Sequence, residues 1–175
     1  MMELKEAFKF CPRCGAKFAR KDPFPKCGNC NLNFYINSKP CNGLLLKNED
    51  GEYLLVERGI EPRKGYYDTP GGFVDEGETF EQSVRREAKE ELGIQLGDLS
   101  YAGSYVDSYV FQDVEYPTII VMFKAKMDKD AVLKADDDVA SFKFFKVEDF
   151  TVEQFAFPWM NDLHRDLLRF NTKNK

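Results

Sequence analysis

The sequence predicts an α/β fold of the α+β type, a sandwich built on a mixed β-sheet and preceded by a small cysteine-rich module. Three observations predict it. Four cysteines form two CxxC pairs near the N-terminus, short apolar runs of strand composition follow, and two amphipathic helical segments are spaced among them. A chain of 175 residues can build one sizeable core with a small appendage. We therefore expect the module in residues 1–37 and the sandwich in residues 38–175.

Composition and charge narrow the classes of function. The chain is 43% hydrophobic and 31% charged, with a net charge of -5, as is common for globular proteins. This charge gives no broad basic field, which argues against indiscriminate nucleic-acid binding. The first residues show no apolar signal-peptide core, and no later run is long enough for a membrane span. We therefore expect a cytoplasmic protein with reduced cysteines.

The clustered cysteines predict a structural zinc site. The two CxxC pairs are Cys11 with Cys14 and Cys27 with Cys30. Each pair makes a tight knuckle that points two thiolates at one tetrahedral position, and we expect Gly15 and Gly28 to permit the sharp turns. A site closed by four sulfurs has no position for water or substrate, so its Zn²⁺ is structural. The alternatives are redox dithiols or unrelated cysteines, and Cys41, outside the pattern, is predicted to be an ordinary buried residue.

A hairpin and a helix are predicted next along the chain. The apolar runs at 41–47 and 53–58 flank Asp50-Gly51, which is a strong hairpin signal. Residues 79–92 are predicted to be a helix, because Thr79 and Gln82 form a capping box and Gly93 provides a C-cap. An apolar stripe at i+4 spacing would hold this helix on the core: Phe80, Val84, Ala88 and Leu92.

Three more strands and a last helix complete the sandwich. The strands are predicted at 99–111, 118–127 and 141–147, and the continuous apolar run of the second suits a central position. Residues 157–170 are predicted to be an amphipathic helix with Pro158 in its first turn. Its apolar side is formed by Trp159, Leu163, Leu167 and Phe170. His164, the sole histidine, is expected to pack or face solvent rather than to catalyse.

Three acidic residues of the 79–92 helix are candidate metal ligands. Glu87, Glu90 and Glu91 are related by i+3 and i+4 spacing, so they meet on one face. Like charges at this spacing repel, and a bound divalent cation would turn the repulsion into ligation. Magnesium suits such oxygen ligands and commonly bridges carboxylates to substrate phosphates. The alternative is a charged, solvated helix face, which is common in proteins.

The full pattern resembles the Nudix box, G-x5-E-x7-R-E-U-x-E-E-x-G-U, in which U is apolar. It runs from Gly72 to Ile94 and is matched at every specified position, with Ala88 small for a U position. The resemblance implies a hydrolase that uses Mg²⁺ or Mn²⁺ to split a nucleoside diphosphate linked to a moiety X. It implies metal ligation by Glu87, Glu90, Glu91 and a backbone carbonyl at Gly71, and a supporting and orienting role for Glu78 and Arg86. The implied reaction is attack of a metal-activated water on a phosphorus.

The resemblance extends to the zinc-ribbon branch of Nudix proteins, which includes NADH pyrophosphatases and hydrolases of FAD and ADP-ribose. The chain lacks the Ser-Gln-Pro-Trp-Pro-Phe-Pro motif of the NADH group after the box, so ADP-ribose or FAD is favoured, with release of AMP. A helix glutamate or the acidic run Asp136, Asp137 and Asp138 would supply a general base, unless that run is only a solvated loop. The candidate substrate contacts are Tyr35, Tyr67 and Asp138, and Tyr109, Phe111 and Tyr116 are further rings for base stacking.

Other readings stay open at this stage. An NADH- or NAD-type dinucleotide or NAD-capped RNA would be an alternative substrate, and a Nudix module without activity would sense a nucleotide. The cysteine module would bind RNA through a basic cluster of Lys9, Arg13, Lys17, Arg20, Lys21 and Lys26, although a scaffold role is favoured over nucleic-acid binding. A homodimer is expected from the resemblance alone.

Overall fold

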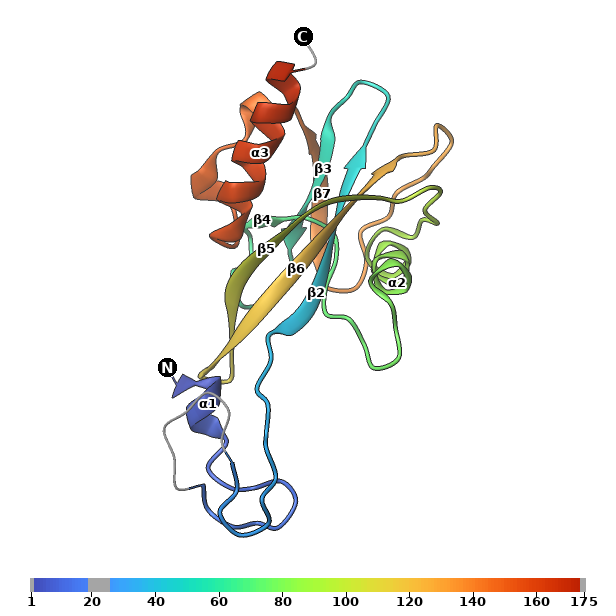
Figure 1. The fold of residues 1–175 in the computed structure, drawn as a ribbon. Helices are drawn as coiled ribbons and strands as arrows, with labels where there is room; N and C mark the ends of the chain where they lie inside the picture. Colours follow the sequence, from blue (N-terminus) through green and yellow to red (C-terminus); the bar gives the residue numbers. More distant parts are fainter. Residues whose placement is uncertain (1, 19–25, 174–175) are drawn as a thin grey trace. The chain divides into compact units, whose positions relative to one another are not determined.

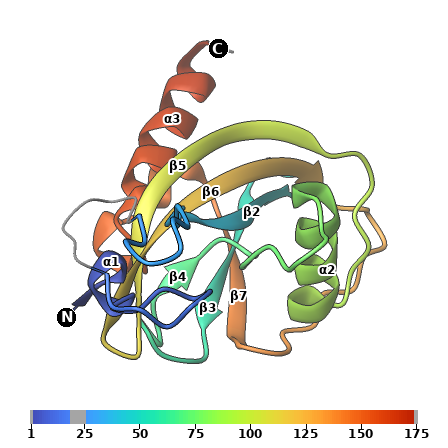
Figure 2. The same cartoon turned by 60° about the horizontal axis from the view of Figure 1, so that its bottom comes forward.

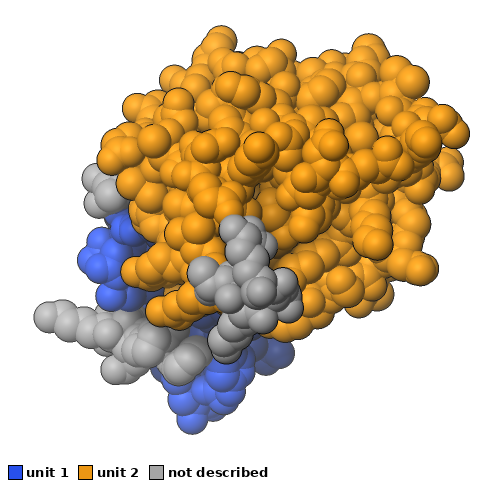
Figure 3. Space-filling model, turned by 90° about the horizontal axis from the view of Figure 1, so that it is seen from above, with its two compact units in different colours: residues 1–39, 108–118 blue, residues 40–107, 119–175 orange. Residues whose placement is uncertain are grey.

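The computed structural model describes residues 2–18 and 26–173. The chain forms two compact units: Met1–Lys39 with Ser108–Thr118, and Pro40–Asp107 with Ile119–Lys175 (Figure 3). The segment from Ser108 to Thr118 thus belongs to the same unit as the cysteine-rich module, although it lies far along the sequence. The division into a ribbon at 1–37 and a catalytic domain at 38–175 stays a prediction.

The larger unit is built on a mixed sheet whose longer strands arise where the apolar runs predict them, whereas the two-residue strand Tyr67–Asp68 was not predicted. In the described part of the chain the strands are β2 (Lys39–Lys47), β3 (Tyr53–Arg58), β4 (Tyr67–Asp68), β5 (Ser100–Phe111), β6 (Val114–Lys126) and β7 (Val139–Phe145). The order runs β6-β2-β3-β4, with β5 paired to β6 and β7 paired to β3. Strands β2 and β3 join at the predicted turn, where Gly51 has a φ of 84° and Lys47 pairs with Tyr53.

Both faces of this sheet are buried, each under one helix (Figures 1 and 2). Leu44, Leu46 and Leu54 pack with helix α2 (Phe80–Leu92), whereas Leu45 and Leu55 pack with helix α3 (Trp159–Lys173). Because successive strand residues point to opposite faces, the uninterrupted apolar run of β2 fills both cores. The predicted sandwich on a mixed β-sheet is confirmed, and its layers are arranged as α/β/α.

Helix α2 has the ends that its sequence predicts. Thr79 and Gln82 form a reciprocal capping box, and Gly93 closes the helix in the left-handed conformation. Val84, Ala88 and Leu92 are almost fully buried. Because this stripe packs on the core, the neighbouring face of the helix, which carries the glutamates, lies toward the loop before α2.

Helix α3 differs from the prediction at one position. Trp159, Leu163 and Leu167 are buried, whereas Phe170, which was predicted on the same side of the helix, is 51% exposed. Its ring instead lies under the Lys124 ammonium, 5.0 Å from the ring centroid, so a cation–π contact replaces burial. His164 packs against the Phe150 ring and has a ring nitrogen 2.9 Å from the Val147 carbonyl oxygen, as its packing role predicts. Two short 3-10 helices, Val147–Asp149 and Val152–Gln154, precede α3.

The smaller unit begins with strand β1 (Met2–Glu3) and helix α1 (Leu4–Ala7). Strand β1 pairs in parallel with the start of β6. Two small hairpins follow, with bridges between Phe10 and Lys17 and between Lys26 and Asn33. Within residues 2–18 and 26–173, no helix has both the length and the apolar character needed to cross a membrane.

The two cysteine hairpins turn at equivalent positions. Gly15 and Asn31, each directly after the second cysteine of its pair, have φ values of 71° and 59°. Asn31, and not Gly28, therefore takes the left-handed position in the second hairpin, and a Cβ at Gly28 would meet no atom within 4 Å. Asparagine is one of the few residues with a side chain that tolerate this conformation.

Candidate metal centres

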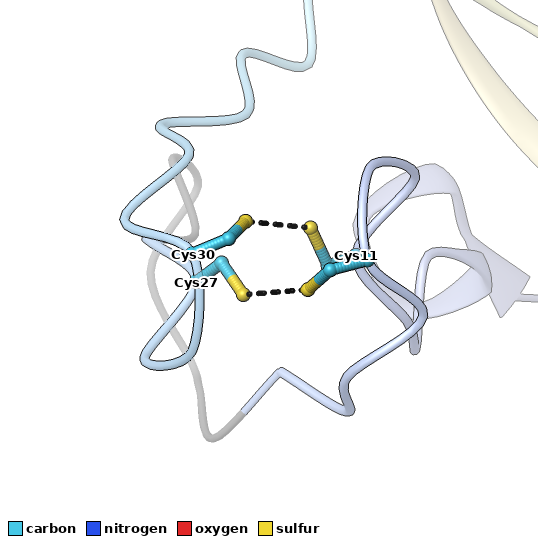
Figure 4. Close-up of side chains that lie close together, drawn as sticks. Cys11, Cys27 and Cys30 are labelled. Atoms are coloured by element: carbon cyan, nitrogen blue, oxygen red, sulfur yellow. Dashed lines mark hydrogen bonds between the residues drawn. The ribbon is translucent and has the colours of Figure 1, made fainter.

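The four clustered cysteines meet at one point in the smaller unit. Their sulfur atoms all lie within 4.8 Å of one another, and the Sγ–Sγ distances are 3.6 Å for Cys11 with Cys30 and for Cys14 with Cys27 (Figure 4). Tetrahedral Zn²⁺ at about 2.3 Å from each sulfur separates the sulfurs by about 3.8 Å. All four are free thiols rather than disulfides. The donor set and its spacing therefore fit a closed, structural zinc site.

The second centre is organised by the guanidinium of Arg86. It forms a two-pronged ion pair with Glu78, in which Nε and Nη2 lie 2.9 and 3.0 Å from the two carboxylate oxygens. Its Nη1 lies 2.9 Å from both Glu87 Oε1 and Glu90 Oε2. This hub lowers the pKa of Glu78 to about 2, mainly through the hydrogen bonds that Arg86 donates. One cation thus holds three of the four glutamates at the specified positions of the box.

Glu91 is the member of the cluster that Arg86 does not reach. Its carboxylate accepts a hydrogen bond of 2.9 Å from the Gly71 N–H, and in the described part of the chain no lysine or arginine forms an ion pair with it. Glu91 is only 5% exposed. Burial raises its pKa to about 9, and the charge of Glu87 adds to this effect. A carboxylate buried in this way can be ionised at neutral pH only if a cation joins it.

Two glycines let the loop before α2 approach these carboxylates closely. A Cβ at Gly72 would lie 2.6 Å from Glu87 Oε1, and a Cβ at Gly71 would lie 2.4 Å from the Asn42 carbonyl oxygen. Gly71 also has a φ of 137°, which residues with a side chain rarely adopt. The loop backbone therefore lies against both β2 and the glutamates only because these side chains are absent.

Replacing Gly71 is expected to destabilise the protein. Gly71→Ala adds a backbone clash to an unfavourable φ, so we expect it to lower the free energy of unfolding by at least about 2 kcal/mol. Gly97→Ala is the matched control, because a Cβ there meets no atom within 4 Å and the φ is ordinary. Urea denaturation of both variants measures the difference. Equal midpoints would show that the loop accommodates a side chain.

The loop between β6 and β7 is tied to the last turn of α2. The Lys134 N–H donates to the Leu92 carbonyl at 3.1 Å, and the Asp136 N–H donates to the Glu91 carbonyl at 3.0 Å. The side chains of Lys134 and Asp136 form an ion pair with each other. The acidic run is thus fixed beside the carboxylate cluster by backbone hydrogen bonds rather than extending freely into solvent.

Two further carboxylates add negative charge to this region. Asp138 is half-buried, and its charge raises the pKa of Asp68, Glu87 and Glu91, in each case after the larger effect of burial. Asp68 pairs with Arg58 at 3.3 Å, yet burial still raises its pKa to about 6. The site therefore concentrates acidic groups and would be stabilised by divalent cations.

These raised pKa values predict how the metal-free protein responds to pH. Glu91 and Asp68 have unfolded-state pKa values of about 4, and their folded values are about 9 and about 6. Groups with raised values contribute stability that is complete near pH 4 and is lost as the pH rises through the folded values. We expect the Tm to fall by about 5–10 °C between pH 5 and pH 9.

The addition of Mg²⁺ is expected to recover most of this loss at pH 8, because the cation binds the ionised carboxylates of the folded state. Calorimetry across this pH range, with EDTA or with Mg²⁺, measures both effects. A metal-free Tm that rises toward pH 9 would contradict the burial of these carboxylates.

The two tyrosines predicted as substrate contacts show no feature that indicates ligand binding. Tyr67 is half-buried and packs edge-on against Phe145, with 5.1 Å between ring centroids, so core packing accounts for its ring. Tyr35 lies in the smaller unit and is 62% exposed. Their roles as substrate contacts stay predictions. Of the basic residues assigned to the module, Arg20 and Lys21 lie outside the described residues.

Three residues of this region were not predicted from the sequence. Asn42 and Ser83 are buried and hydrogen-bonded to each other at 2.8 Å, and Asp68 stands on β4 among the acidic groups. Asn42 interrupts an apolar strand run and Ser83 interrupts the buried side of a helix. A polar residue at a core position is the signal by which both were detectable.

A family model described as NUDIX domain matches residues 39–167. Among similar curated proteins, the NAD-capped RNA hydrolase NudC of Vibrio vulnificus (strain CMCP6) is 33% identical over 103 residues, covering 58% of this chain and 39% of that protein. The protein of the same name from Pseudomonas aeruginosa (strain LESB58) is 28% identical over 143 residues, covering 80% of this chain and 48% of that protein. The chain thus spans less than half the length of both relatives.

Solved structures share the fold. A NUDIX hydrolase from Nitrosomonas europaea superposes with a TM-score of 0.65 at 25% identity, covering 93% of this chain and 89% of that one. The MutT protein from Methanosarcina mazei Go1 gives 0.62 at 26% identity, with coverages of 78% and 95%. The NUDIX domain of Shewanella oneidensis NrtR, solved in complex with ADP ribose, gives 0.61 at 21% identity, with coverages of 76% and 88%.

Proposed function

The chain belongs to the Nudix family, and from this premise we propose that it is a divalent-metal-dependent pyrophosphohydrolase. Its substrate would be a nucleoside diphosphate linked to a moiety X, cleaved within the diphosphate. Mg²⁺ is the proposed metal, with Mn²⁺ as a substitute, and Zn²⁺ would be held separately by the four cysteines. Nudix enzymes use divalent metal, and the carboxylates of this chain supply the hard oxygen ligands that Mg²⁺ requires.

The observation that carries the proposal is the pair formed by the buried Glu91 and the half-buried Glu87. Glu91 is 5% exposed and lacks a cationic partner among the described residues, whereas Glu87 shares the single cation Arg86 with Glu78 and Glu90. A solvated helix face would not bury a carboxylate whose pKa rises to about 9. The arrangement is costly for an empty site and favourable for one that takes up metal.

Each residue of the cluster would have a separate role in metal binding or proton transfer. Glu87, Glu90 and Glu91, with the Gly71 carbonyl, would hold the metal, and Glu78 would hold Arg86 against the loop. When bound, the metal lowers the pKa of a water and neutralises charge that develops on the phosphoryl oxygens. Asp138, half-buried beside the cluster, is the proposed proton acceptor for the attacking water.

Within this class we propose ADP-ribose or FAD as the substrate, with AMP as one product. The absence of the Ser-Gln-Pro-Trp-Pro-Phe-Pro motif supports this choice over NADH. The second candidate is an NAD-type dinucleotide or NAD-capped RNA, which is favoured by the names of the two bacterial relatives and by the cysteine cluster. A sensing module without activity is disfavoured, because such a module would not need every predicted metal ligand.

A substrate panel tests the proposal. We expect hydrolysis with Mg²⁺, abolished by EDTA, of ADP-ribose or FAD at a kcat/KM at least about tenfold above that of NADH and NAD-capped RNA. Chromatography of the products identifies the broken bond, with diadenosine polyphosphates and nucleoside triphosphates as further substrates. Preference for NAD-capped RNA would favour the second candidate. No hydrolysis of any compound with either metal would overturn the proposed activity.

A further inference from the structure

We infer that Asn42 is a positioning residue for the metal-binding loop, an inference that concerns the proposed active site and rests on the proposed function. Asn42 lies on β2, outside the box, and is 3% exposed. Its side-chain amide donates to Ser83 Oγ at 2.8 Å and to the Gly72 carbonyl at 3.3 Å. One amide thus joins the central sheet to the loop and to helix α2.

The contact with the loop fixes the orientation of this amide. A backbone carbonyl can only accept a hydrogen bond, so the atom of Asn42 that faces Gly72 must be the nitrogen. The amide oxygen is then buried and has no hydrogen-bond partner among the described residues. A buried acceptor without a donor is unfavourable for folding, so stability alone does not explain an asparagine in this apolar strand.

The amide connects directly to the hub of the glutamate cluster. Ser83 Oγ accepts a hydrogen bond from Arg86 Nη2 at 3.2 Å and donates to the Phe73 carbonyl at 3.3 Å. Arg86 Nη2 also donates to that carbonyl at 3.1 Å. A chain of short contacts therefore runs from Asn42 through Ser83 to the guanidinium that holds three glutamates.

The folded structure does not depend on the Asn42 side chain to satisfy its partners. The Gly72 carbonyl also accepts the backbone N–H of residue 42 at 2.9 Å, and Ser83 keeps both Arg86 and Phe73 as partners. Removing the amide leaves no other group unpaired. What it removes is the side-chain bridge from the Gly72 carbonyl to Ser83 on α2, and with it a constraint on the position of Gly72 relative to the glutamates.

The test compares metal binding, turnover and stability in the zinc-loaded full chain. Asn42→Leu keeps the branched shape, and Asn42→Ala serves if the larger side chain is not accommodated. We expect either variant to weaken Mn²⁺ binding about tenfold by calorimetry, and to lower kcat about 10- to 100-fold with KM changed less than about threefold. Tyr105→Phe is the matched control, since it removes a hydrogen bond to Asp166 away from this site.

The outcomes separate positioning from packing. We expect the Tm of Asn42→Leu to change no more than that of Tyr105→Phe. We also expect that adding Ser83→Ala to Asn42→Leu causes little further loss of Mn²⁺ affinity, because Asn42 and Ser83 act through one chain of contacts. Unchanged Mn²⁺ affinity, or a Tm loss far beyond the control, overturns the inference. An inactive wild type whose Mn²⁺ affinity still depends on Asn42 would refute the proposed hydrolase and retain the inference. An active wild type whose Mn²⁺ affinity does not change when Asn42 is replaced would support the proposed hydrolase and refute the inference.

Discussion

Glu91→Gln is expected to lower kcat by at least about 10³-fold while the protein stays folded. The glutamine keeps the size of the side chain and an oxygen for the Gly71 N–H, but it loses the negative charge that a metal requires. Because that charge is buried and costs stability when no metal is bound, the metal-free Tm should not fall. Steady-state kinetics with the best substrate of the panel, together with calorimetry, measure both effects.

The same chemical change elsewhere on the helix provides the control. Glu81 lies exposed in the first turn of α2, so Glu81→Gln should retain full kcat. A wild-type kcat in Glu91→Gln would remove this carboxylate from the proposed mechanism. A loss of rate accompanied by a large loss of Tm would instead assign Glu91 a structural role.

Loss of one cluster cysteine is expected to unfold the smaller unit. Cys27 is 1% exposed, and Cys27→Ala leaves three sulfurs for a metal that contributes about 10–16 kcal/mol in comparable small modules. We expect zinc content to fall from one ion per chain to near zero by elemental analysis. Hydrogen exchange should lose its protection in the described part of residues 2–39 and in 108–118, and stay protected in the rest of the described chain.

Cys41→Ser distinguishes loss of zinc from loss of any thiol. Cys41 is half-buried outside the cluster, and burial raises its pKa to about 12, which makes it a poor thiolate. We expect zinc content and protection to match the wild type. Retention of zinc and of exchange protection in Cys27→Ala would contradict a four-cysteine site.

Local sequence signals predicted most of the fold. The capping box, the Gly93 cap and the i+4 stripe specify α2 because their partners are close in sequence. The glutamates are brought together by helical spacing alone, so the box predicts their proximity without tertiary information. The exposed Phe170 escaped prediction because an amphipathic pattern does not show how far along the helix the core extends.

The parts that the sequence left open depend on contacts between distant segments. Asn42 lies 30 residues from Gly72 and 41 residues from Ser83, and a polar residue in an apolar run gives no hint of its partner. The acidic run 136–138 is joined to α2 by the backbone bond from Asp136 to Glu91, a contact that its sequence does not reveal. Burial of Glu91 likewise follows from packing, since the spacing makes all three glutamates equivalent.

The two backbone hydrogen bonds between the end of α2 and the β6–β7 loop bear on where the length of this loop can vary. Since the chain is held at Lys134 and Asp136, insertions or deletions upstream, within residues 128–133, would change the loop without shifting the acidic group that follows. The backbone from Lys134 to Asp136 therefore keeps a fixed position relative to the end of α2. Length variation among related sequences should therefore occur before residue 134 and not within residues 134–136.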